Sequence, residues 1–315
     1  MEKLRIVFMG TPEFAVGILD SILKNNYEVV GVVTAADKPA GRGQKIKYSE
    51  VKEYAMTHHL RLLQPTNLKE ESFLAELKSL NVNLQVVVAF RMLPEVVWRM
   101  PKLGTFNLHA SLLPNYRGAA PINWAIINGE TKTGVTTFFI DDKIDTGAMI
   151  LSSEIEIGAN ENAGQLHDRL MQLGSKTVLE TLVLIEKGNV VTTIQEDKNP
   201  LKTAHKLDKE NCKIDWSKSG AEIYNLIRGL SPYPSAWCSF SDGNQEWNIK
   251  IYEAEFEKEK QTLTVGEIVS TKKELKIAVK DGFIKILNLQ FPGKKRMDSK
   301  ELLNGMDFSK ITNAL

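Results

Sequence analysis

The feature of this sequence that most limits its possible folds is the alternation, along its first half, of short apolar runs with segments of helical periodicity. The apolar runs are rich in Val, Ile and Phe and occupy residues 4–9, 28–34, 84–89 and 105–109. Segments with apolar residues every three or four positions lie between them, at 13–23, near 50–58 and at 68–79. Buried parallel strands have such a composition, and alternating strands and helices build βαβ units. The pattern predicts an α/β fold with a Rossmann-like, mostly parallel sheet.

The rest of the chain changes character after about residue 190. Strand-like runs at 134–140 and 149–157 and a long helix at 163–187 complete the first predicted domain, 1–190. Polar residues 191–206, around Asn199 and Pro200, are predicted to form a linker. One helix and five short strand-like runs follow, at 219–228, 236–240, 247–254, 264–269, 275–279 and 283–289. Such short strands with glycine-containing turns predict a small OB-like β-barrel domain at 207–315.

Composition limits the class of protein. Hydrophobic residues make up 43% of the 315 positions and charged residues 25%, which is typical of folded domains with a buried core. No run approaches the roughly 20 apolar residues of a membrane helix, so we expect a cytoplasmic protein. The two cysteines, Cys212 and Cys238, have no histidine at metal-ligand spacing, which predicts neither a disulfide nor a metal site. The net charge of +1 does not decide between nucleic acid and other partners.

Three polar side chains are expected to meet at one edge of the predicted sheet. Asn107 and His109 lie two residues apart in a strand, so their side chains leave the same face. The strand runs into residues 111–118, Ser-Leu-Leu-Pro-Asn-Tyr-Arg-Gly, at the carboxyl end where open α/β sheets bind their ligands. Asp145 follows another predicted strand and is expected to reach the same crevice. Each feature alone has a structural alternative, a packed histidine or an Asp-Thr-Gly turn.

Together these residue types suit acyl transfer to an amine. An imidazole is largely neutral at pH 7, so His109 is predicted to accept the proton of the attacking nitrogen, which contributes about 10²–10⁴ in rate. Asp145 is predicted to fix the tautomer of His109 and to stabilise its imidazolium form. The Asn107 amide is predicted to donate a hydrogen bond to the oxyanion of the tetrahedral intermediate. This chemistry requires no Ser or Cys nucleophile.

The Asn-Leu-His triplet at 107–109, the loop 111–118 and the Asp-Thr-Gly at 145–147 together resemble the formyltransferases that use 10-formyltetrahydrofolate. The likeness is greatest to the members that act on methionyl-tRNA, and it continues through residues 8–15, 118–122, 214–216 and 228–237. It implies transfer of a formyl group to methionyl-initiator tRNA, which gives N-formylmethionyl-tRNA for translation initiation. It also implies that 1–190 is catalytic and that 207–315 helps to hold tRNA. We expect the enzyme to act as a monomer.

The resemblance assigns a role to individual residues. Asn107, His109 and Asp145 are implied to be catalytic. Folate is implied to contact one loop and one further wall of the site, made by Ser111, Leu112, Leu113, Pro114, Phe90 and Leu93. In that wall Arg91 stands where the family has a glycine, and the loop is one residue shorter. The basic loop 37–47 is implied to enter the tRNA acceptor stem, with Arg42, Lys45 and Lys47 as its contacts, although a basic surface loop is also compatible with simple solvation.

Three alternative functions are compatible with part of the sequence. A folate-dependent formyltransferase that acts on an amino sugar or a nucleotide amine would use the same three catalytic residues. A nicotinamide-dependent dehydrogenase would share the βαβ beginning, but of the glycines in G-x-G-x-x-G only Gly10 is present. A non-catalytic RNA-binding protein would use the basic loop and the barrel, and it would leave the cluster around His109 without a role.

Overall fold

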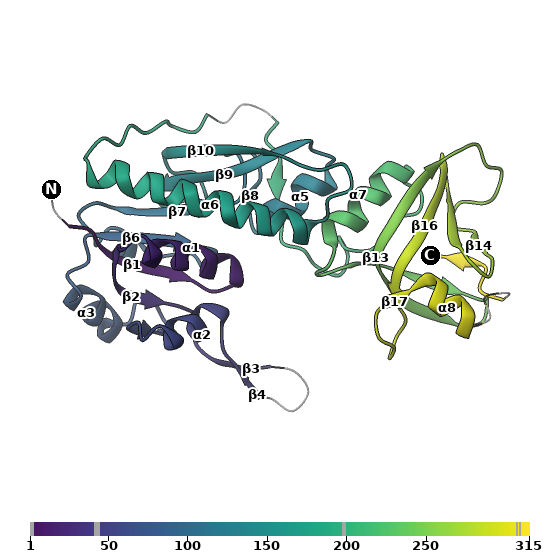
Figure 1. The fold of residues 1–315 in the computed structure, drawn as a ribbon, viewed down its shortest axis with the longest axis horizontal. Coiled ribbons are helices and arrows are strands. Elements are labelled where there is room, and N and C mark those ends of the chain that lie inside the picture. Colours follow the sequence, from purple (N-terminus) through teal and green to yellow (C-terminus); the bar gives the residue numbers. More distant parts are fainter. Residues whose placement is uncertain (1–2, 41–44, 197–199, 307, 309) are drawn as a thin grey trace. The chain divides into compact units, whose positions relative to one another are not determined.

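The computed structural model of this chain describes residues 3–40, 45–196, 200–306, 308 and 310–315. The chain forms two compact units, both drawn in Figure 1. The first comprises Met1–Gly118, Thr133–Ile155 and His167–Thr203, and the second comprises Ala119–Lys132, Glu156–Leu166 and Ala204–Leu315. The units are therefore interleaved in sequence, and the domain limits 1–190, 191–206 and 207–315 stay a prediction. Residues 197–199 of the expected linker lie outside the described residues.

The first unit is built on a seven-stranded sheet. Its strands, in the order in which they lie side by side, are β10 (Met149–Glu156), β9 (Lys132–Phe139), β7 (Thr105–His109), β6 (Leu84–Val88), β1 (Arg5–Gly10), β2 (Glu28–Val33) and β5 (Leu62–Leu63). The pairs from β7 to β5 are parallel, and β7 with β9 is antiparallel. Every residue of β6 is buried, as in a strand covered on both faces. The predicted mostly parallel sheet is confirmed.

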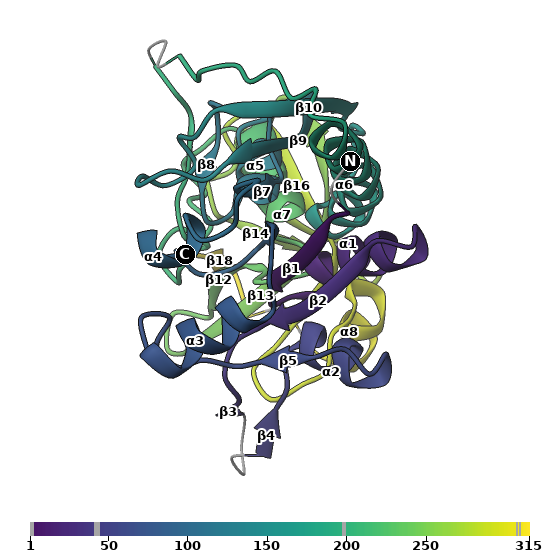
Figure 2. The same ribbon diagram turned by 90° about the vertical axis from the view of Figure 1, so that its left-hand side faces the viewer.

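Helices cover both faces of this sheet. The helices α1 (Glu13–Lys24) and α6 (Ala163–Glu186) lie on one side of β1 and β2 in Figure 2, and α3 (Glu71–Ser79) lies on the other. The remaining helices of the first unit are α2 (Glu50–Thr57) and α4 (Glu95–Trp98). Val7 and Met9 of β1 pack in one cluster with Phe73 and Leu77 of α3. Alternate residues of the strands thus face opposite helices, which explains their continuous apolar runs.

The polar segment after β2 contains two short strands, β3 (Lys38–Ala40) and β4 (Lys45–Lys47), which pair as an antiparallel hairpin. Asp37 lies at its base, where Oδ2 accepts a hydrogen bond of 2.5 Å from Lys52 Nζ and Oδ1 accepts one of 2.9 Å from Gln64 Nε2. The Lys52 ammonium, and then the Gln64 amide, hold the pKa of the Asp37 carboxyl below its usual value. The contacts of Asp37 with Lys52 and Gln64 therefore hold the base of the hairpin in place. Arg42 lies outside the described residues.

The second unit contains an antiparallel sheet that closes on itself. Its path is β14 (Ile268–Ser270), β15 (Leu275–Val279), β16 (Gly282–Gln290), β13 (Glu246–Lys258), β12 (Ala236–Ser241) and β18 (Asn313–Ala314), with β17 (Met297–Asp298) beside β16. The two ends meet because Ile268 N donates to Thr312 O and Ala314 N donates to Gly266 O, each over 2.8 Å. This closure confirms the predicted barrel-like sheet, whose inner side chains include Cys238, Phe240 and Ile277.

Among the described residues, the helices that lie wholly in the second unit are α5 (Pro121–Ile127), α7 (Gly220–Leu230) and α8 (Ser299–Gly305). The α7 helix begins with a capping box, in which Ser219 and Glu222 exchange hydrogen bonds with each other's backbone. The α5 and α7 helices approach closely at Gly229, where a Cβ would lie 2.6 Å from Ile127 Cγ1. Two short strands, β8 (Arg117–Gly118) and β11 (Thr203–Ala204), form a separate two-stranded sheet.

Several boundaries differ from those expected. The α3 helix begins at Glu71 rather than at residue 68, and β14 begins at Ile268 because Glu267 N donates to Thr264 O in a turn before it. The helices α5 and α8 were not predicted, since 7 residues are too few to establish a helical period. Among the described residues, no helix combines the length and the apolar character needed to cross a membrane.

Candidate active site

His109 ends β7 at the carboxyl edge of the parallel strands, and its ring is buried. The preceding residue, Leu108, points toward Gly174 of α6, so His109 and Asn107 point to the opposite face of the sheet. His109 Nε2 lies 2.8 Å from the carbonyl oxygen of Tyr116. A carbonyl oxygen only accepts, so Nε2 carries the proton and the lone pair of the neutral ring is on Nδ1. The backbone of the following loop thereby orients the imidazole.

Asp145, in the turn between β9 and β10, lies on the Nδ1 side of His109. Its Oδ2 is 3.8 Å from Nδ1, which is longer than a hydrogen bond, and instead accepts one of 2.9 Å from Gly118 N. The Tyr116 carbonyl is the atom within hydrogen-bond distance of the ring, and the expectation that Asp145 fixes the tautomer stays a prediction. Asp145 faces the nitrogen that becomes positive on protonation, an arrangement that suits stabilisation of the imidazolium.

The loop 111–118 is tied down at both ends. Ser111 is fully buried, and its Oγ donates to Asn115 O over 2.7 Å. Thr136 of β9 donates from Oγ1 to Ser111 O over 2.7 Å and accepts from Leu113 N over 3.2 Å. Leu113 is buried, whereas Leu112 and Pro114 are partly exposed. Leu112 and Pro114 are therefore the members of the predicted folate loop whose side chains remain available to a ligand.

Two residues at the site adopt left-handed backbone conformations that non-glycine residues rarely take: Tyr116 at φ 61° and Asp145 at φ 55°. Each conformation is supported by hydrogen bonds, from Tyr116 N to Lys202 O over 2.6 Å and from Gly118 N to the Asp145 carboxylate. Such conformations persist where the surroundings fix them, and they concentrate at functional sites. Here they direct one carbonyl and one carboxylate toward the same imidazole.

Gln195 connects the turn that carries Asp145 to the loop that carries Tyr116. Its Nε2 donates to Asp145 O over 2.9 Å and to Gly147 O over 2.8 Å. Its Oε1 accepts from Arg117 Nε and Nη2 over 3.1 and 2.8 Å. Sequence reasoning missed Gln195 because it lies in the predicted linker, and missed Thr136 because its strand offered no sign of a role. Nothing in either local pattern signals these contacts.

Asn107 lies between Val87 of β6 and Phe138 of β9 and is partly exposed. Within the part of the chain that the structure describes, its side-chain amide has no hydrogen-bond partner. An amide that is neither bonded nor deeply buried is available to donate to a ligand oxygen. Its position two residues before His109 places that donor on the same face as the imidazole.

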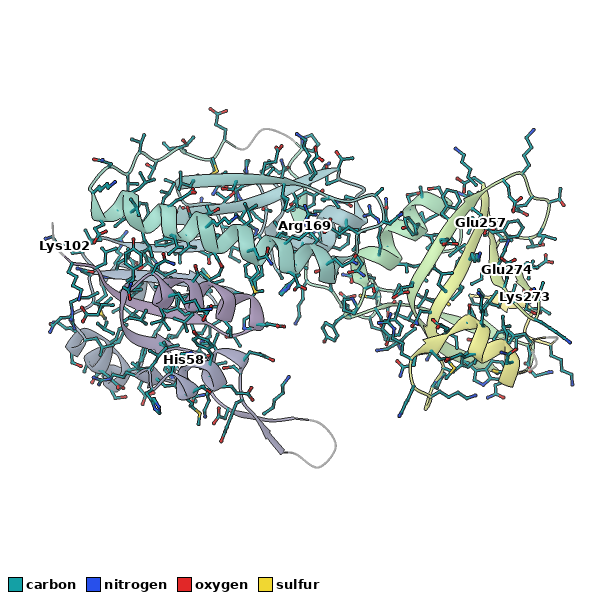
Figure 3. The ribbon with its side chains drawn as sticks, viewed as in Figure 1. His58, Lys102, Arg169, Glu257, Lys273 and Glu274 are labelled. Carbon is teal, nitrogen blue, oxygen red and sulfur yellow. The ribbon has the colours of Figure 1, made fainter. Side chains whose placement is uncertain are left out.

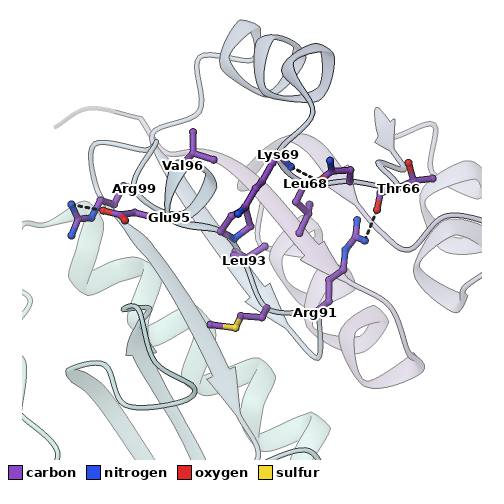
Figure 4. Close-up of a pocket in the computed structure, with 11 residues that line it drawn as sticks. Thr66, Leu68, Lys69, Arg91, Leu93, Glu95, Val96 and Arg99 are labelled. Atoms are coloured by element: carbon purple, nitrogen blue, oxygen red, sulfur yellow. Dashed lines mark hydrogen bonds and ion pairs between the residues drawn. The ribbon is translucent and has the colours of Figure 1, made fainter.

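The other predicted folate wall borders a broad hollow of about 1030 Å³, shown in Figure 4. Leu93 is buried in its lining, whereas Phe90 lies outside the lining and packs against the sheet's apolar cluster. Arg91, which the family resemblance places at a glycine position, donates from Nη1 to Thr66 O over 2.9 Å and from Nη2 to Pro65 O. The arginine thus ties its own loop to the segment after β5. Its guanidinium is committed to protein carbonyls.

The predicted tRNA contacts are distributed along the hairpin. Arg42 lies outside the described residues, and Lys45 is a residue of β4. Lys47 ends that strand with a largely exposed side chain, and its Nζ lies 3.6 Å from Glu50 Oε1. This long exposed pair contributes little to stability, so Lys47 remains accessible to a phosphate.

The geometry as a whole joins an imidazole, a carboxyl group and an amide at the carboxyl edge of an α/β sheet. That combination is able to take a proton from an amine and to stabilise an oxyanion. The Formyl transferase family model matches residues 4–182, and the model of the Formyl transferase C-terminal domain matches residues 206–307. The chain belongs to the formyl transferase family.

Relatives within the family carry a more specific name. The chain is 76% identical to a methionyl-tRNA formyltransferase from Flavobacterium johnsoniae over 98% of both chains. It is 72% identical to a methionyl-tRNA formyltransferase from Flavobacterium psychrophilum over 99% of both chains. Among solved structures, an N-formyltransferase from Helicobacter canadensis, in complex with folinic acid and dTDP-3-aminofucose, aligns with a TM-score of 0.65 and 23% identity, over 90% of this chain and 98% of that chain. At that identity the structural likeness establishes the fold.

Proposed function

We propose that this chain transfers the formyl group of 10-formyltetrahydrofolate to the amino group of methionyl-initiator tRNA, which yields N-formylmethionyl-tRNA and tetrahydrofolate. The observation that carries the proposal is the placement of His109 between the Tyr116 carbonyl and the Asp145 carboxylate. The substrate follows from relatives of 72–76% identity that are named methionyl-tRNA formyltransferases and align over nearly the whole chain. Such an enzyme acts where translation takes place, in the cytoplasm, and we propose that it acts as a monomer.

The proposed reaction assigns one task to each polar group. The methionyl nitrogen attacks the formyl carbon, and the carbonyl oxygen becomes an oxyanion that accepts a hydrogen bond from the Asn107 amide. His109 takes the proton from that nitrogen on Nδ1, and the resulting positive charge lies 3.8 Å from Asp145 Oδ2. The bond between the formyl carbon and N10 then breaks, and the proton passes to N10 of the departing tetrahydrofolate. The balance needs no metal and no covalent enzyme intermediate.

Two further sets of residues are proposed to bind the substrates, one set the folate and the other the tRNA. Ser111, Leu112, Leu113 and Pro114 form the folate side of the site with Leu93 and Phe90, and the partly exposed Leu112 and Pro114 offer apolar surface to a pterin ring. Arg42, Lys45 and Lys47 are proposed to contact tRNA phosphates, because a basic segment suits a polyanion and the side chain of Lys47 is exposed.

One competition experiment tests the assignment. The enzyme receives 10-formyltetrahydrofolate labelled in the formyl carbon, together with initiator methionyl-tRNA, free methionine and a UDP-amino sugar in equal amounts. We expect label in the tRNA fraction, at the methionine nitrogen, and none in free methionine. Label confined to the sugar would replace the tRNA substrate with an amino sugar while keeping formyl transfer. No label in any amine would overturn the proposal altogether.

A further inference from the structure

The second unit carries a hollow of about 390 Å³ that lies apart from the residues discussed so far. It is bordered by Trp237 of β12, Asn248 and Lys250 of β13, and Leu207 and Lys209 of the segment before α7. Its volume falls within the range of small-ligand sites, about 300–1,000 Å³. All of these residues belong to the same compact unit, so the hollow is a feature of that unit alone.

The strand register brings its aromatic and basic side chains together. Trp237 pairs with Lys250, and the next outward pair is Ser239 with Asn248, so these side chains leave the outer face of the barrel. The segment 207–214 lies along β12, because Ile214 N donates to Trp237 O over 2.8 Å and Trp237 N donates to Cys212 O over 3.1 Å. The indole Nε1 donates to Lys209 O over 2.7 Å, which fixes the ring. The tryptophan is therefore a rigid, partly exposed platform.

Two ammonium groups lie near the indole ring, and a third lysine borders the hollow. Lys209 Nζ lies 5.1 Å and Lys213 Nζ lies 5.5 Å from the centre of the Trp237 ring, and Lys250 stands opposite Trp237 on β13. In the part of the chain that the structure describes, none of these lysines forms an ion pair with a carboxylate. The carboxylate in the lining, Asp208, accepts hydrogen bonds from Glu210 N and Asn211 N in its own turn. The pocket thus has an excess of positive charge.

Other lysines of the same barrel are paired differently. Lys276 Nζ lies 2.6 Å from Glu257 Oε2, and Lys285 Nζ lies 3.1 Å from Glu274 Oε1. Figure 3 labels Glu257 and Glu274 among the side chains of this unit. Hydrogen bonds to those glutamates raise the pKa of both lysines. Lys276 and Lys285 are thus balanced by carboxylates on the sheet, in contrast to the lysines around Trp237.

We propose that the Trp237 pocket binds one unpaired nucleotide of the tRNA, with the base against the indole and the neighbouring phosphates against Lys209, Lys213 and Lys250. A base stacks on an aromatic side chain whatever its identity, and lysines bind phosphates as point charges. The combination of a fixed ring and unpaired cations matches both parts of a nucleotide. The proposal rests on the proposed function, because it takes tRNA as the substrate and assigns it a contact outside the active site.

The test compares two triple variants that lose the same charge. In the first, Lys209, Lys213 and Lys250 are each replaced by Gln. In the matched control, Lys260, Lys272 and Lys273 are replaced by Gln, since these are exposed lysines in other loops of the same unit. Binding of a deacylated initiator tRNA transcript is measured by filter retention at four salt concentrations. A Trp237→Leu variant, checked for its melting temperature, is measured beside them.

We expect the pocket variant to bind tRNA at least tenfold more weakly, with a salt slope reduced by about 2, since about 0.7 counterions are released per single-strand phosphate contact. Trp237→Leu should weaken binding about tenfold without changing the slope. The control should change binding less than twofold. An equal loss in both triple variants would mean general charge attraction and would overturn the pocket, as would unchanged binding in the first. Wild-type formylation of tRNA, measured separately, keeps this outcome distinct from failure of the proposed function.

Discussion

In the first unit, the polar groups around His109 are fixed by bonds to distant parts of the chain, whereas in the second unit the lysines around Trp237 carry no carboxylate partner in the described residues. Gln195 reaches Asp145 and Arg117 from 50 and 78 residues away, and Tyr116 N reaches Lys202 O. Lys209, Lys213 and Lys250 are instead exposed on the barrel surface. The polar groups around His109 are held in fixed orientations. The lysines around Trp237 provide a local excess of positive charge.

The difference reflects what each region has to do. Proton transfer requires a donor and an acceptor within hydrogen-bond distance, and misplacement by about 1 Å costs on the order of 10² in rate. Attraction of a phosphate requires charge nearby, and a flexible ammonium supplies it without a fixed direction. Changes around His109 should therefore act on kcat, and changes around Trp237 should act on tRNA affinity and its salt dependence. The following predictions test that division, beginning with the largest effect.

Replacing His109 by Ala should lower kcat for formylation by about 10²–10⁴, because the base for the attacking nitrogen is removed. The dissociation constant for tRNA should stay within twofold of the wild-type value. Single-turnover rates and filter binding measure the two quantities. His59→Ala, at an exposed histidine of the same unit, is the control. A kcat within threefold of wild type would remove His109 from the mechanism.

Two glycines provide a matched pair in which an added methyl meets a backbone carbonyl. A Cβ at Gly147 would lie 1.7 Å from Phe139 O, and one at Gly282 would lie 2.0 Å from Glu257 O. Gly147→Ala should lower kcat by about 100-fold, since it displaces the turn that carries Asp145. Gly282→Ala should lower the melting temperature while the folded fraction keeps its kcat. Equal kcat losses in the two variants would show that the turn has no special role.

Replacing Gln195 by Ala should lower kcat by roughly tenfold, because two donors to the Asp145 turn are lost, with a decrease in unfolding free energy of about 1–3 kcal/mol. Gln195→Glu separates its two contacts. Glu still accepts from Arg117, but a carboxylate cannot donate to Asp145 O and Gly147 O. Both variants should therefore show the lower kcat with an unchanged KM for folate. Full activity in Gln195→Glu would assign the role to the Arg117 contact instead.

The smallest effect concerns pH and the hairpin base. The pKa of Asp37 is held low in the folded protein by Lys52 and Gln64, so its contribution to stability is complete above the unfolded-state pKa and is lost as pH falls through the folded pKa. Asp37→Asn should therefore be less stable than wild type at pH 7, and the difference should shrink in acid. Urea unfolding between pH 3 and 7 measures it. A difference that is constant across this range would exclude the ion pair as its cause.

Much of the first sheet was predictable because its determinants are local. The strands β1, β2, β6 and β7 are continuous apolar runs, and a strand that is buried on both faces leaves that mark in its own residues. A barrel was predictable, but the residues that close it were not, because β18 is two residues long and pairs with Gly266 and Ser241, which are far away in sequence. The same holds for the interleaving of the two units, which depends on contacts of α5 with α7.

For the site, the sequence by itself determined which functional groups are present and on which face they lie. The spacing of Asn107 and His109 follows from the alternation of side chains along a strand, and Asp145 follows the strand beside them. Only the tertiary structure decided which atom orients the imidazole: the Tyr116 carbonyl, with Asp145 at 3.8 Å on the other side. A backbone carbonyl is the same in every residue, and Gln195 reaches the site only when the chain folds back, so neither contact is marked in the sequence.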